Sequence, residues 1–305
     1  MKQILSVAFV ALLAACQTAP VDTPIADSPI PVPQAETAPD APAPIPGHQW
    51  LYGSAESSVS MRQTWASIAG FVEAKAASGP SHGVVLAPGS TPEQPSFLPC
   101  EGKPLAAVFD ADETLIWNLG SMGYFTRAGI GFDPGVWDDW ERTGAGKTAP
   151  VPGALAGLDR IRAAGVTVIV NTNRASVNAA GTVDTLSAAG IGDFTHGETL
   201  FLRGDAPDGS DKDGRRAMIA DKYCAIALVG DQLGDIADPF NDKTLSVAER
   251  RALTEAPSVA GLWGNGWFVL PNPVYGPSIR GGFDEVFPPE THWEPTPEGE
   301  ADVIN

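Results

Sequence analysis

Four short apolar runs constrain the fold of this 305-residue chain more than any other feature. They cover residues 105–109, 166–170, 225–229 and 267–270. None of them alternates with polar residues, which indicates strands that are buried on both faces. The stretches between the first three runs are long enough for crossover helices. The pattern therefore predicts a parallel α/β sheet.

Helix signals fall between and before these runs, where such a sheet needs covering layers. Residues 57–77 place Met61, Trp65, Ile68 and Val72 on one face at spacings of four, three and four, which predicts an amphipathic helix packed on the core. Proline, serine and capping-box signals predict further helices that begin near Pro152, Ser176 and Ser246.

The residues directly after the first three predicted strands are polar. Asp110 and Asp112 follow the first, residues 171–174 (Asn-Thr-Asn-Arg) follow the second, and residues 230–235 (Gly-Asp-Gln-Leu-Gly-Asp) follow the third. In open parallel sheets, ligands bind at the carboxyl ends of the strands. Three polar strand ends on one edge are costly to bury without partners, and a divalent cation with a phosphate would satisfy them.

These residue types permit phosphoryl transfer through a carboxylate. Asp110 is placed to attack phosphorus, and Asp112 can protonate the leaving oxygen and then deprotonate water. Mg²⁺ prefers oxygen ligands, so Asp110, Asp231 and a loop carbonyl would suffice to hold it. The phosphoryl oxygens need donors, and Thr172, Asn173 and a lysine could supply them.

Two lysines are candidates for that cation. Lys212 lies in a loop just before a predicted helix, close to Arg215 and Arg216. Lys222 directly precedes the third strand, at the opposite, amino end. The position of Lys212 favours it, and Lys222 remains the alternative.

The amino terminus has the features of a secretion signal. Residues 1–16 have a charged start, an apolar core and the ending Leu-Ala-Ala-Cys16, which resembles the bacterial lipobox, whose cysteine is diacylated. Residues 17–47 are rich in Pro and Ala and predict an extended linker, with a proline-rich ligand for a partner as the alternative. Residues 48–290 then form the folded domain and 291–305 a tail.

Charge and cysteine content narrow the partners and the compartment. The formal net charge of −18, without any Lys/Arg-rich block, excludes duplex nucleic acid as a partner. With Cys16 assigned to lipid, Cys100 and Cys224 remain as an even pair in an oxidising compartment. Whether those two cysteines form a disulfide is left open by the sequence.

The ordered set Asp110, Thr172, Lys212 and Asp231 resembles the four motifs of the haloacid dehalogenase (HAD) superfamily. The similarity extends to the class C acid phosphatases, the bacterial outer-membrane lipoprotein branch of that superfamily. The segments that carry it are 50–56, 137–140, 151–153, 172–174, 230–235 and 270–276.

This resemblance implies a fold and an activity. The fold is a HAD-like Rossmannoid parallel sheet flanked by helices, with a small, mainly helical cap for which residues 118–148 are the candidate. The activity is a Mg²⁺-dependent phosphomonoesterase, often acting on 5'-nucleotides and nicotinamide mononucleotide. The implied location is the bacterial outer membrane, lipid-anchored and facing the periplasm or the surface.

The resemblance also assigns roles to individual residues. Asp110 is the nucleophile, and Asp112 is the general acid and base as well as a metal ligand through its carbonyl. Asp231 is a metal ligand and Asp235 a supporting acid beside it, which completes the expected metal set.

One departure from the family pattern affects the leaving-group side. Many members carry Asp-Asn after the first motif, whereas here Trp117 precedes Asn118. Tyr275, together with Trp117 or Tyr124, could stack on a nucleobase or another flat group, with core packing as the alternative for each ring.

Two other functions use the same residues. A catalytically silent surface lipoprotein could bind a phosphorylated ligand, and a phosphotransferase could pass the phosphoryl group to an alcohol instead of water. The sequence leaves the oligomeric state open, a dimer included.

Overall fold

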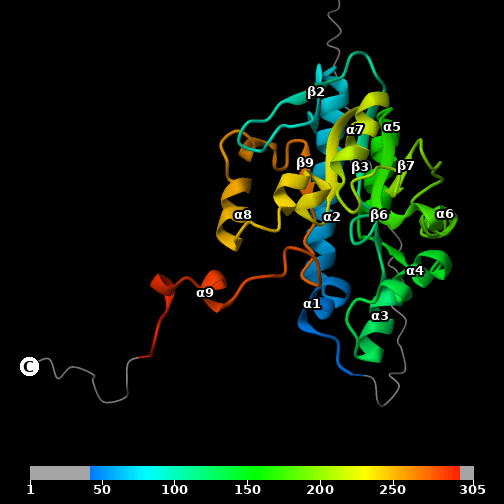
Figure 1. The fold of residues 1–305 in the computed structure, drawn as a ribbon. Helices are drawn as coiled ribbons and strands as arrows, with labels where there is room; N and C mark the ends of the chain where they lie inside the picture. Colours follow the sequence, from blue (N-terminus) through cyan, green and yellow to red (C-terminus); the bar gives the residue numbers. More distant parts are fainter. Residues whose placement is uncertain (1–41, 296–305) are drawn as a thin grey trace, which may run out of the picture. The chain divides into compact units, whose positions relative to one another are not determined.

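A five-stranded parallel sheet forms the centre of residues 42–295, the part of the chain that the computed structural model describes. The strand order is β7-β6-β3-β8-β9, and each neighbouring pair is parallel (Figure 1). The signal sequence, Cys16 and most of the proline-rich segment lie outside the described residues. The five strands are β3 (Leu105–Phe109), β6 (Thr167–Ala175), β7 (Leu200–Arg203), β8 (Cys224–Gly230) and β9 (Trp267–Val269).

Four of these strands lie where the apolar runs predicted them, and the α/β fold class is confirmed. The edge strand β7 was not predicted, because it spans only four residues and ends in Arg203. β6 is longer than its apolar run, since the polar residues after Val170 continue the strand through an irregularity in its pairing with β7. The whole of the second polar segment, residues 171–174, therefore lies within a strand rather than in a loop.

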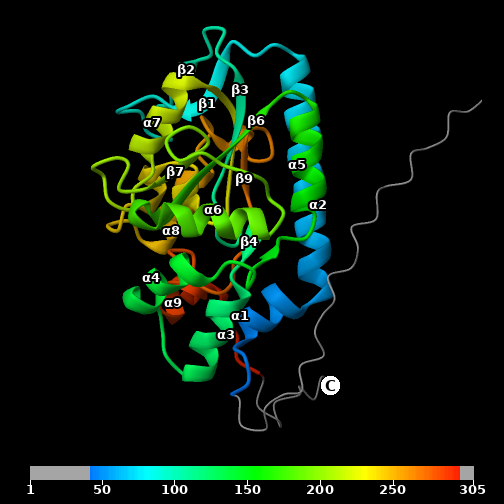
Figure 2. The ribbon, with the colours of Figure 1, turned by 90° about the vertical axis from the view of Figure 1, so that its right-hand side faces the viewer.

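Helices cover both faces of the sheet. Figure 2 shows α2 and α5 side by side on one face, with α7 and α8 on the other. On the first face, the Trp65 ring of α2 stacks on Phe109 of β3 with centroids 5.3 Å apart, and both side chains are buried. The helices are α2 (Ala55–Ala77), α5 (Ala154–Ala163), α6 (Ala179–Ala188), α7 (Asp213–Lys222) and α8 (Val247–Thr254).

The helix signals read from the sequence are present in the structure. The apolar stripe predicted for the first long helix is buried along α2, and Ser54 caps that helix by accepting a hydrogen bond from the Ser57 N–H at 3.0 Å. Ser246 and Glu249 form the predicted capping box at the start of α8. No helix within residues 42–295 is long and apolar enough to cross a membrane.

Smaller elements surround the sheet. Two helices lie between β4 and β5, within residues 118–148, the segment predicted as a cap; this helical segment is called the cap below (Figure 1). An antiparallel pair, β1 with β2, precedes the sheet, and β4 pairs with β5 below the cap. These elements are α1 (Pro46–His48), the π-helix Gln49–Gly53, β1 (His82–Leu86), β2 (Phe97–Pro99), β4 (Ile116–Trp117), α3 (Leu119–Ala128), α4 (Pro134–Thr143), β5 (Ala149–Pro150) and α9 (Phe283–Val286).

Cys100 and Cys224, whose pairing the sequence left open, form a disulfide in the structure. Cys100 directly follows β2, and Cys224 is the first residue of β8, 124 positions later. The bond therefore ties the β1-β2 pair to the amino end of a central strand. A cross-link over so long a loop restricts the unfolded chain and stabilises the fold by about 2–4 kcal/mol.

The contact between α2 and α5 gives a test of core packing. A methyl group added at Gly157 of α5 would lie 2.6 Å from Trp65 Cε3, and the Trp65 ring is only 1% exposed. Because neither side can move freely, we expect Gly157→Ala to lower the free energy of unfolding by about 1–3 kcal/mol. Chemical denaturation monitored by circular dichroism measures this change in the free energy of unfolding.

Gly70→Ala is the matched control within α2. The nearest atom to its added methyl group is 3.8 Å away, so the higher helix propensity of alanine should leave stability unchanged or raise it by up to about 1 kcal/mol. Equal effects of the two substitutions would show that the contact between Gly157 and Trp65 does not limit packing.

Candidate active site

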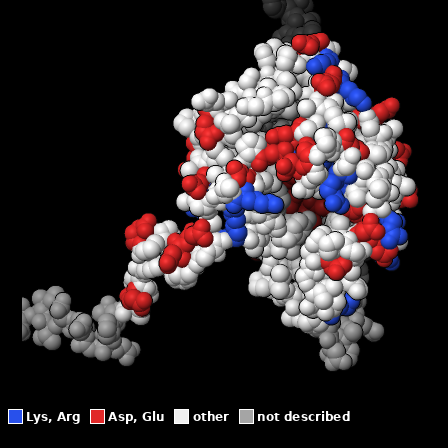
Figure 3. Space-filling view, in the orientation of Figure 1, with Lys and Arg blue, Asp and Glu red and all other residues white. Residues whose placement is uncertain are grey.

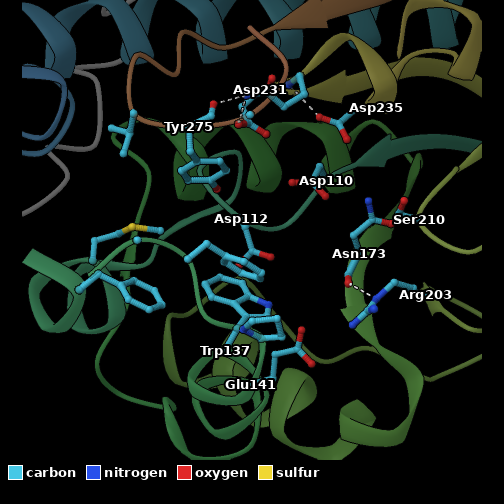
Figure 4. Close-up of a pocket in the computed structure, with 18 of the residues that line it drawn as sticks. Asp110, Asp112, Trp137, Glu141, Asn173, Arg203, Ser210, Asp231, Asp235 and Tyr275 are labelled. Atoms are coloured by element: carbon cyan, nitrogen blue, oxygen red, sulfur yellow. Dashed lines mark hydrogen bonds between the residues drawn. The ribbon is translucent and has the colours of Figure 1, made fainter. Parts of the chain in front are cut away.

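A cavity of about 750 Å³ opens at the carboxyl ends of the parallel strands, beneath the cap. Asp110 directly follows β3 and Asp231 directly follows β8, so the topology alone brings these two acids to the cavity floor. The Asp110 N–H donates to the Val229 carbonyl of β8, which extends the pairing of the two strands up to the site. Figure 4 shows Asp110, Asp231 and Asp235 together on one side of the pocket.

The structure separates the two candidate lysines. Lys222 ends α7, and its Nζ donates to the Gly197 carbonyl at 2.7 Å and lies 5.8 Å from the centre of the Phe201 ring. It does not line the cavity. Lys212 lies at the other end of α7, as the residue before its first turn, and it lines the cavity.

The ammonium group of Lys212 lies between two of the carboxylates. Its Nζ is 2.5 Å from Asp110 Oδ1, 2.7 Å from Asp235 Oδ1 and 2.9 Å from the Asn171 carbonyl oxygen. The side chain is 4% exposed. Burial alone would lower the pKa of Lys212, but the two carboxylates raise it, so the lysine is charged at neutral pH.

One lysine does not neutralise the acids gathered here. Asp110, Asp231 and Asp235 each place a carboxylate oxygen within 4.8 Å of the others. Burial raises the pKa of Asp110 to about 7 against the opposing effect of Lys212, and burial with the two neighbouring acids raises that of Asp231 well above its usual value. Within residues 42–295, the Asp231 side chain accepts hydrogen bonds only from the neutral amides of Gln232 and Asn272. This donor set fits a hard divalent cation, which would stabilise the ionised forms.

A carbonyl oxygen is available to complete such a site. The Asp112 carbonyl accepts no hydrogen bond from residues 42–295, and Asp112 lines the cavity together with Asp110 and Asp231. Asp235 is engaged differently, because its Oδ1 accepts from Lys212 and its Oδ2 from the Gln232 N–H. Its contacts are those of an acid that holds the lysine in place.

The side chain of Asp112 is held by two residues that the sequence reading did not assign to the site. Arg174, which is fully buried, donates from Nε and Nη2 to Asp112 Oδ1 at 3.0 and 2.8 Å. Asn118 Nδ2 donates to the same oxygen at 2.9 Å, and its Oδ1 accepts from Arg174 and from Trp140 Nε1 of the cap. The carboxyl group is thereby fixed in orientation and coupled to α4.

The carboxylate of Glu113 is also buried, and it is held by several hydrogen bonds. Its backbone has a left-handed φ of 56°, which is unusual for a residue other than glycine. Its carboxylate accepts hydrogen bonds from the Tyr52 hydroxyl at 3.1 Å, from the Asn118 N–H at 2.9 Å and from the Tyr275 hydroxyl. Burial, with Asp112 adjacent, raises the pKa of Glu113 to about 7. Glu113 thus fixes the ring of Tyr275 at the cavity wall.

The segment after Val170 presents one of its two predicted phosphate ligands to the cavity. Asn173 lines it, and its Oδ1 accepts from Arg215 Nη2 at 2.5 Å. Thr172 is fully buried and does not line it; its carbonyl accepts from Arg215 Nη1, and its Oγ1 accepts from the Arg174 N–H. Arg215 therefore holds this segment against α7, beside Lys212.

Of the three aromatic residues predicted for the leaving-group side, the structure places only Tyr275 on the cavity wall. Trp117 points into the core and packs edge-on against Tyr52. Tyr124 is 46% exposed, because its neighbour Phe125 takes the inward side of α3. The apolar wall is instead formed mainly by Met122, Phe125, Ile130, Phe132, Trp137 and Val274.

Comparison with known proteins agrees with this geometry. Residues 87–278, more than half of the chain, match the family model for the HAD superfamily, subfamily IIIB (acid phosphatase). The fold is similar to a class C acid phosphatase from Bacillus anthracis, with a TM-score of 0.61 and 22% identity over 76% of this chain and 84% of that one.

A second structure of a class C acid phosphatase from Bacillus anthracis, with tungstate bound, also has a TM-score of 0.61. Its identity is 19%, over 82% of this chain and 90% of that one. At these identities the structural matches support the fold, and the family model supports the activity. The chain therefore belongs to subfamily IIIB of the HAD superfamily and is a phosphomonoesterase of the acid phosphatase family.

Proposed function

We propose that this phosphomonoesterase is a Mg²⁺-dependent enzyme that hydrolyses small phosphomonoesters through an aspartyl-phosphate intermediate outside the cytoplasm. The observation that carries the proposal is the position of Asp110. It lies on the cavity floor, between the ammonium group of Lys212 and the carboxylate of Asp231. A carboxylate that lies beside a cation and beside a group of oxygens able to bind a metal ion is suited to attack phosphorus.

The proposed metal ligands are Asp110, Asp231 and the carbonyl oxygen of Asp112, with Asp235 acting through Lys212. When bound, Mg²⁺ would stabilise negative charge on the phosphoryl group and on Asp110. The carboxylate oxygens of Asp110 and Asp231 lie within 4.8 Å of each other, close enough to share one ion, which supports this assignment.

In the first step, an oxygen of Asp110 forms a bond to phosphorus while the bond from phosphorus to the leaving oxygen breaks. Asp112 gives its proton to that leaving oxygen. In the second step, Asp112 takes a proton from water, whose oxygen attacks phosphorus and releases Asp110 and inorganic phosphate. The positive charge of Lys212 and the N–H₂ group of Asn173 would stabilise the negative charge on the phosphoryl oxygens.

The geometry around Asp112 supports its role as the general acid and base. Arg174 and Asn118 fix its carboxyl group on the cavity wall. Asp112 lies two residues after the proposed nucleophile, Asp110. A proton donor must be held within hydrogen-bond reach of the leaving oxygen. The contact from Trp140 to Asn118 makes this orientation depend on the cap.

The cavity suits a leaving group with a flat or apolar part. Its volume of about 750 Å³ exceeds the need of a phosphoryl group, and the aromatic side chains of Tyr275, Phe132 and Trp137 also line it. Nucleoside 5'-monophosphates and nicotinamide mononucleotide, which the family resemblance suggests, combine these features. Trp117 and Tyr124 do not contribute to this wall.

The proposed location rests on two features. Cys16 ends a lipobox-like sequence, and lipid attached there would anchor the protein to the outer membrane. The disulfide between Cys100 and Cys224 supports an oxidising compartment, because such bonds are rare in the cytosol.

Substitution of the two proposed catalytic acids gives the first functional test. Asp110→Asn should abolish phosphate release, because an amide cannot act as the nucleophile. Asp112→Asn should lower kcat by about 10²–10⁴-fold, the usual contribution of general acid–base catalysis. Phosphate release from p-nitrophenyl phosphate in the presence of Mg²⁺ measures both.

Asp139→Asn is the matched control, since Asp139 is an exposed acid of α4 whose side chain pairs with Arg142. Its activity should equal that of the wild type. Near-normal turnover by Asp110→Asn would remove Asp110 from the nucleophilic role.

Metal addition gives a test that does not depend on turnover. Because Mg²⁺ would bind only the folded chain, it should raise the Tm of EDTA-treated protein, by an amount equivalent to about 2.7 kcal/mol at 100 times Kd. Asp231→Asn should lose most of this shift, whereas Asp221→Asn, an exposed acid on α7, should keep it. The absence of any shift in the wild type, with activity unaffected by EDTA, would contradict the metal assignment.

The lipid anchor is tested by Cys16→Ala. Without a thiol to acylate, the variant should move from the membrane fraction to the soluble fraction of a bacterial host. Detergent phase partitioning measures the distribution, and unchanged partitioning would refute lipidation at Cys16.

A further inference from the structure

Arg203 lies at the carboxyl end of the edge strand β7 and lines the active-site cavity. Arg203 is the last residue of β7, and Asp110 directly follows β3, so both lie at the carboxyl ends of parallel strands. Of the described residues that line the cavity, only Arg203 and Lys212 carry a permanent positive charge. The mechanism above uses Lys212 and leaves Arg203 without a role.

The two cations differ in their partners. Lys212 is paired with Asp110 and Asp235. Arg203 uses only its Nε, which donates to the Asn173 carbonyl at 3.1 Å, and no acidic side chain of residues 42–295 lies within ion-pair distance of it. The nearby acid Asp205 is bonded instead to His196 and to the Leu202 N–H. Both terminal nitrogens of Arg203 are therefore open to a ligand.

Two neutral donors lie on the same wall. Asn173 and Ser210 line the cavity beside Arg203, and Figure 4 shows the three side chains on the opposite side of the view from Tyr275. The Oδ1 of Asn173 is occupied by Arg215, which leaves the Nδ2 group as its free end. Ser210 Oγ makes no hydrogen bond to any described residue. The wall thus offers a guanidinium, an amide N–H₂ and a hydroxyl.

The positive charge of Arg203 on this wall contrasts with the net negative charge of the protein. The chain has a formal net charge of −18, and Figure 3 shows several separate groups of acidic side chains on the face drawn, with fewer basic groups among them. Because Arg203 forms no ion pair with any described acidic side chain, its charge does not stabilise the fold through such a pair. Its guanidinium geometry matches a carboxylate or a phosphate, each of which accepts two parallel hydrogen bonds.

We propose that Arg203 and Ser210, which lie beside Asn173, form a second anion subsite that binds an acidic group on the leaving group of the substrate. This inference rests on the proposed function and specifies its substrate class. Preferred substrates carry a carboxylate or a further phosphate in addition to the phosphoryl group that is transferred. The leaving group then has an apolar part against Tyr275 and Trp137 and an acidic part against Arg203.

Matched substrates test the subsite. For wild type and Arg203→Gln, kcat/KM is measured with phenyl phosphate and 3-carboxyphenyl phosphate, and with adenosine 5'-monophosphate and adenosine 3',5'-bisphosphate. We expect the preference for the acidic member of a pair to fall about tenfold in Arg203→Gln, because one charge-assisted contact is lost. The kcat/KM for phenyl phosphate should stay within twofold of the wild type. The pair that shows the larger loss identifies the acidic group that the subsite accepts.

Three further variants separate a charge effect from a structural one. Arg203→Lys should retain part of the preference, and Ser210→Ala should reduce it by a smaller factor than Arg203→Gln. Arg251→Gln, an exposed arginine of α8 outside the cavity, changes the net charge equally and should leave the preference unchanged. An equal loss on all substrates, or no loss in Arg203→Gln, would overturn the subsite.

A binding measurement keeps this test independent of turnover. Calorimetry compares benzylphosphonate with 3-carboxybenzylphosphonate, neither of which can be hydrolysed. The carboxylated ligand should bind about tenfold more tightly to the wild type, and Arg203→Gln should remove the difference. Equal affinity of the wild type for the two ligands would overturn the subsite, whereas loss of catalysis with this difference retained would overturn only the proposed function.

Discussion

The contact of Lys212 with Asp110 and Asp235 is the interaction on which the site depends. It joins three segments that are distant in the sequence: the end of β3, the start of α7 and the loop after β8. Burying these carboxylates without the ammonium group would leave uncompensated charge, and breaking such a buried pair costs about 3–5 kcal/mol. No cation of the described residues pairs with the third carboxylate, Asp231, and that excess charge favours a divalent ion at this edge of the sheet.

Buried arginines hold the loops around this centre. Arg215 bonds to the carbonyl of Thr172 and the side chain of Asn173, while its neighbour Arg216 donates to the carbonyls of Gly234 and Asp235. Since both arise from α7 just after Lys212, one helix fixes the spacing of the motifs that follow β6 and β8. Electrostatic catalysis requires donors that are already in place before the reaction, and these contacts supply that preorganisation.

The sheet and the position of the acids at its edge could be predicted because both depend on local pattern. Apolar runs mark buried strands, and the carboxyl ends of parallel strands meet at one edge, so Asp110 and Asp231 were placed correctly. The contacts of Glu113 could not be predicted, because its partners Tyr52 and Tyr275 lie 61 and 162 residues away. The direction of individual side chains could not be predicted from the sequence either. Trp117 points into the core, while Phe132 and Trp137 of the cap line the cavity. The position of Arg203 at the cavity was not predicted, because β7 is too short to recognise as a strand. The signal that could have indicated it is a charged residue directly after the short apolar run Leu200-Phe-Leu.

The central claim is that Asp110 carries the phosphoryl group during turnover. The most direct measurement is acid quenching of Asp112→Asn during reaction with a phosphomonoester, followed by mass spectrometry of its peptides. Without the acid that activates water, the intermediate should accumulate, and the peptide that contains Asp110 should gain the mass of one phosphoryl group. A phosphoryl group found on another residue, or turnover without any covalent adduct under these conditions, would contradict the account.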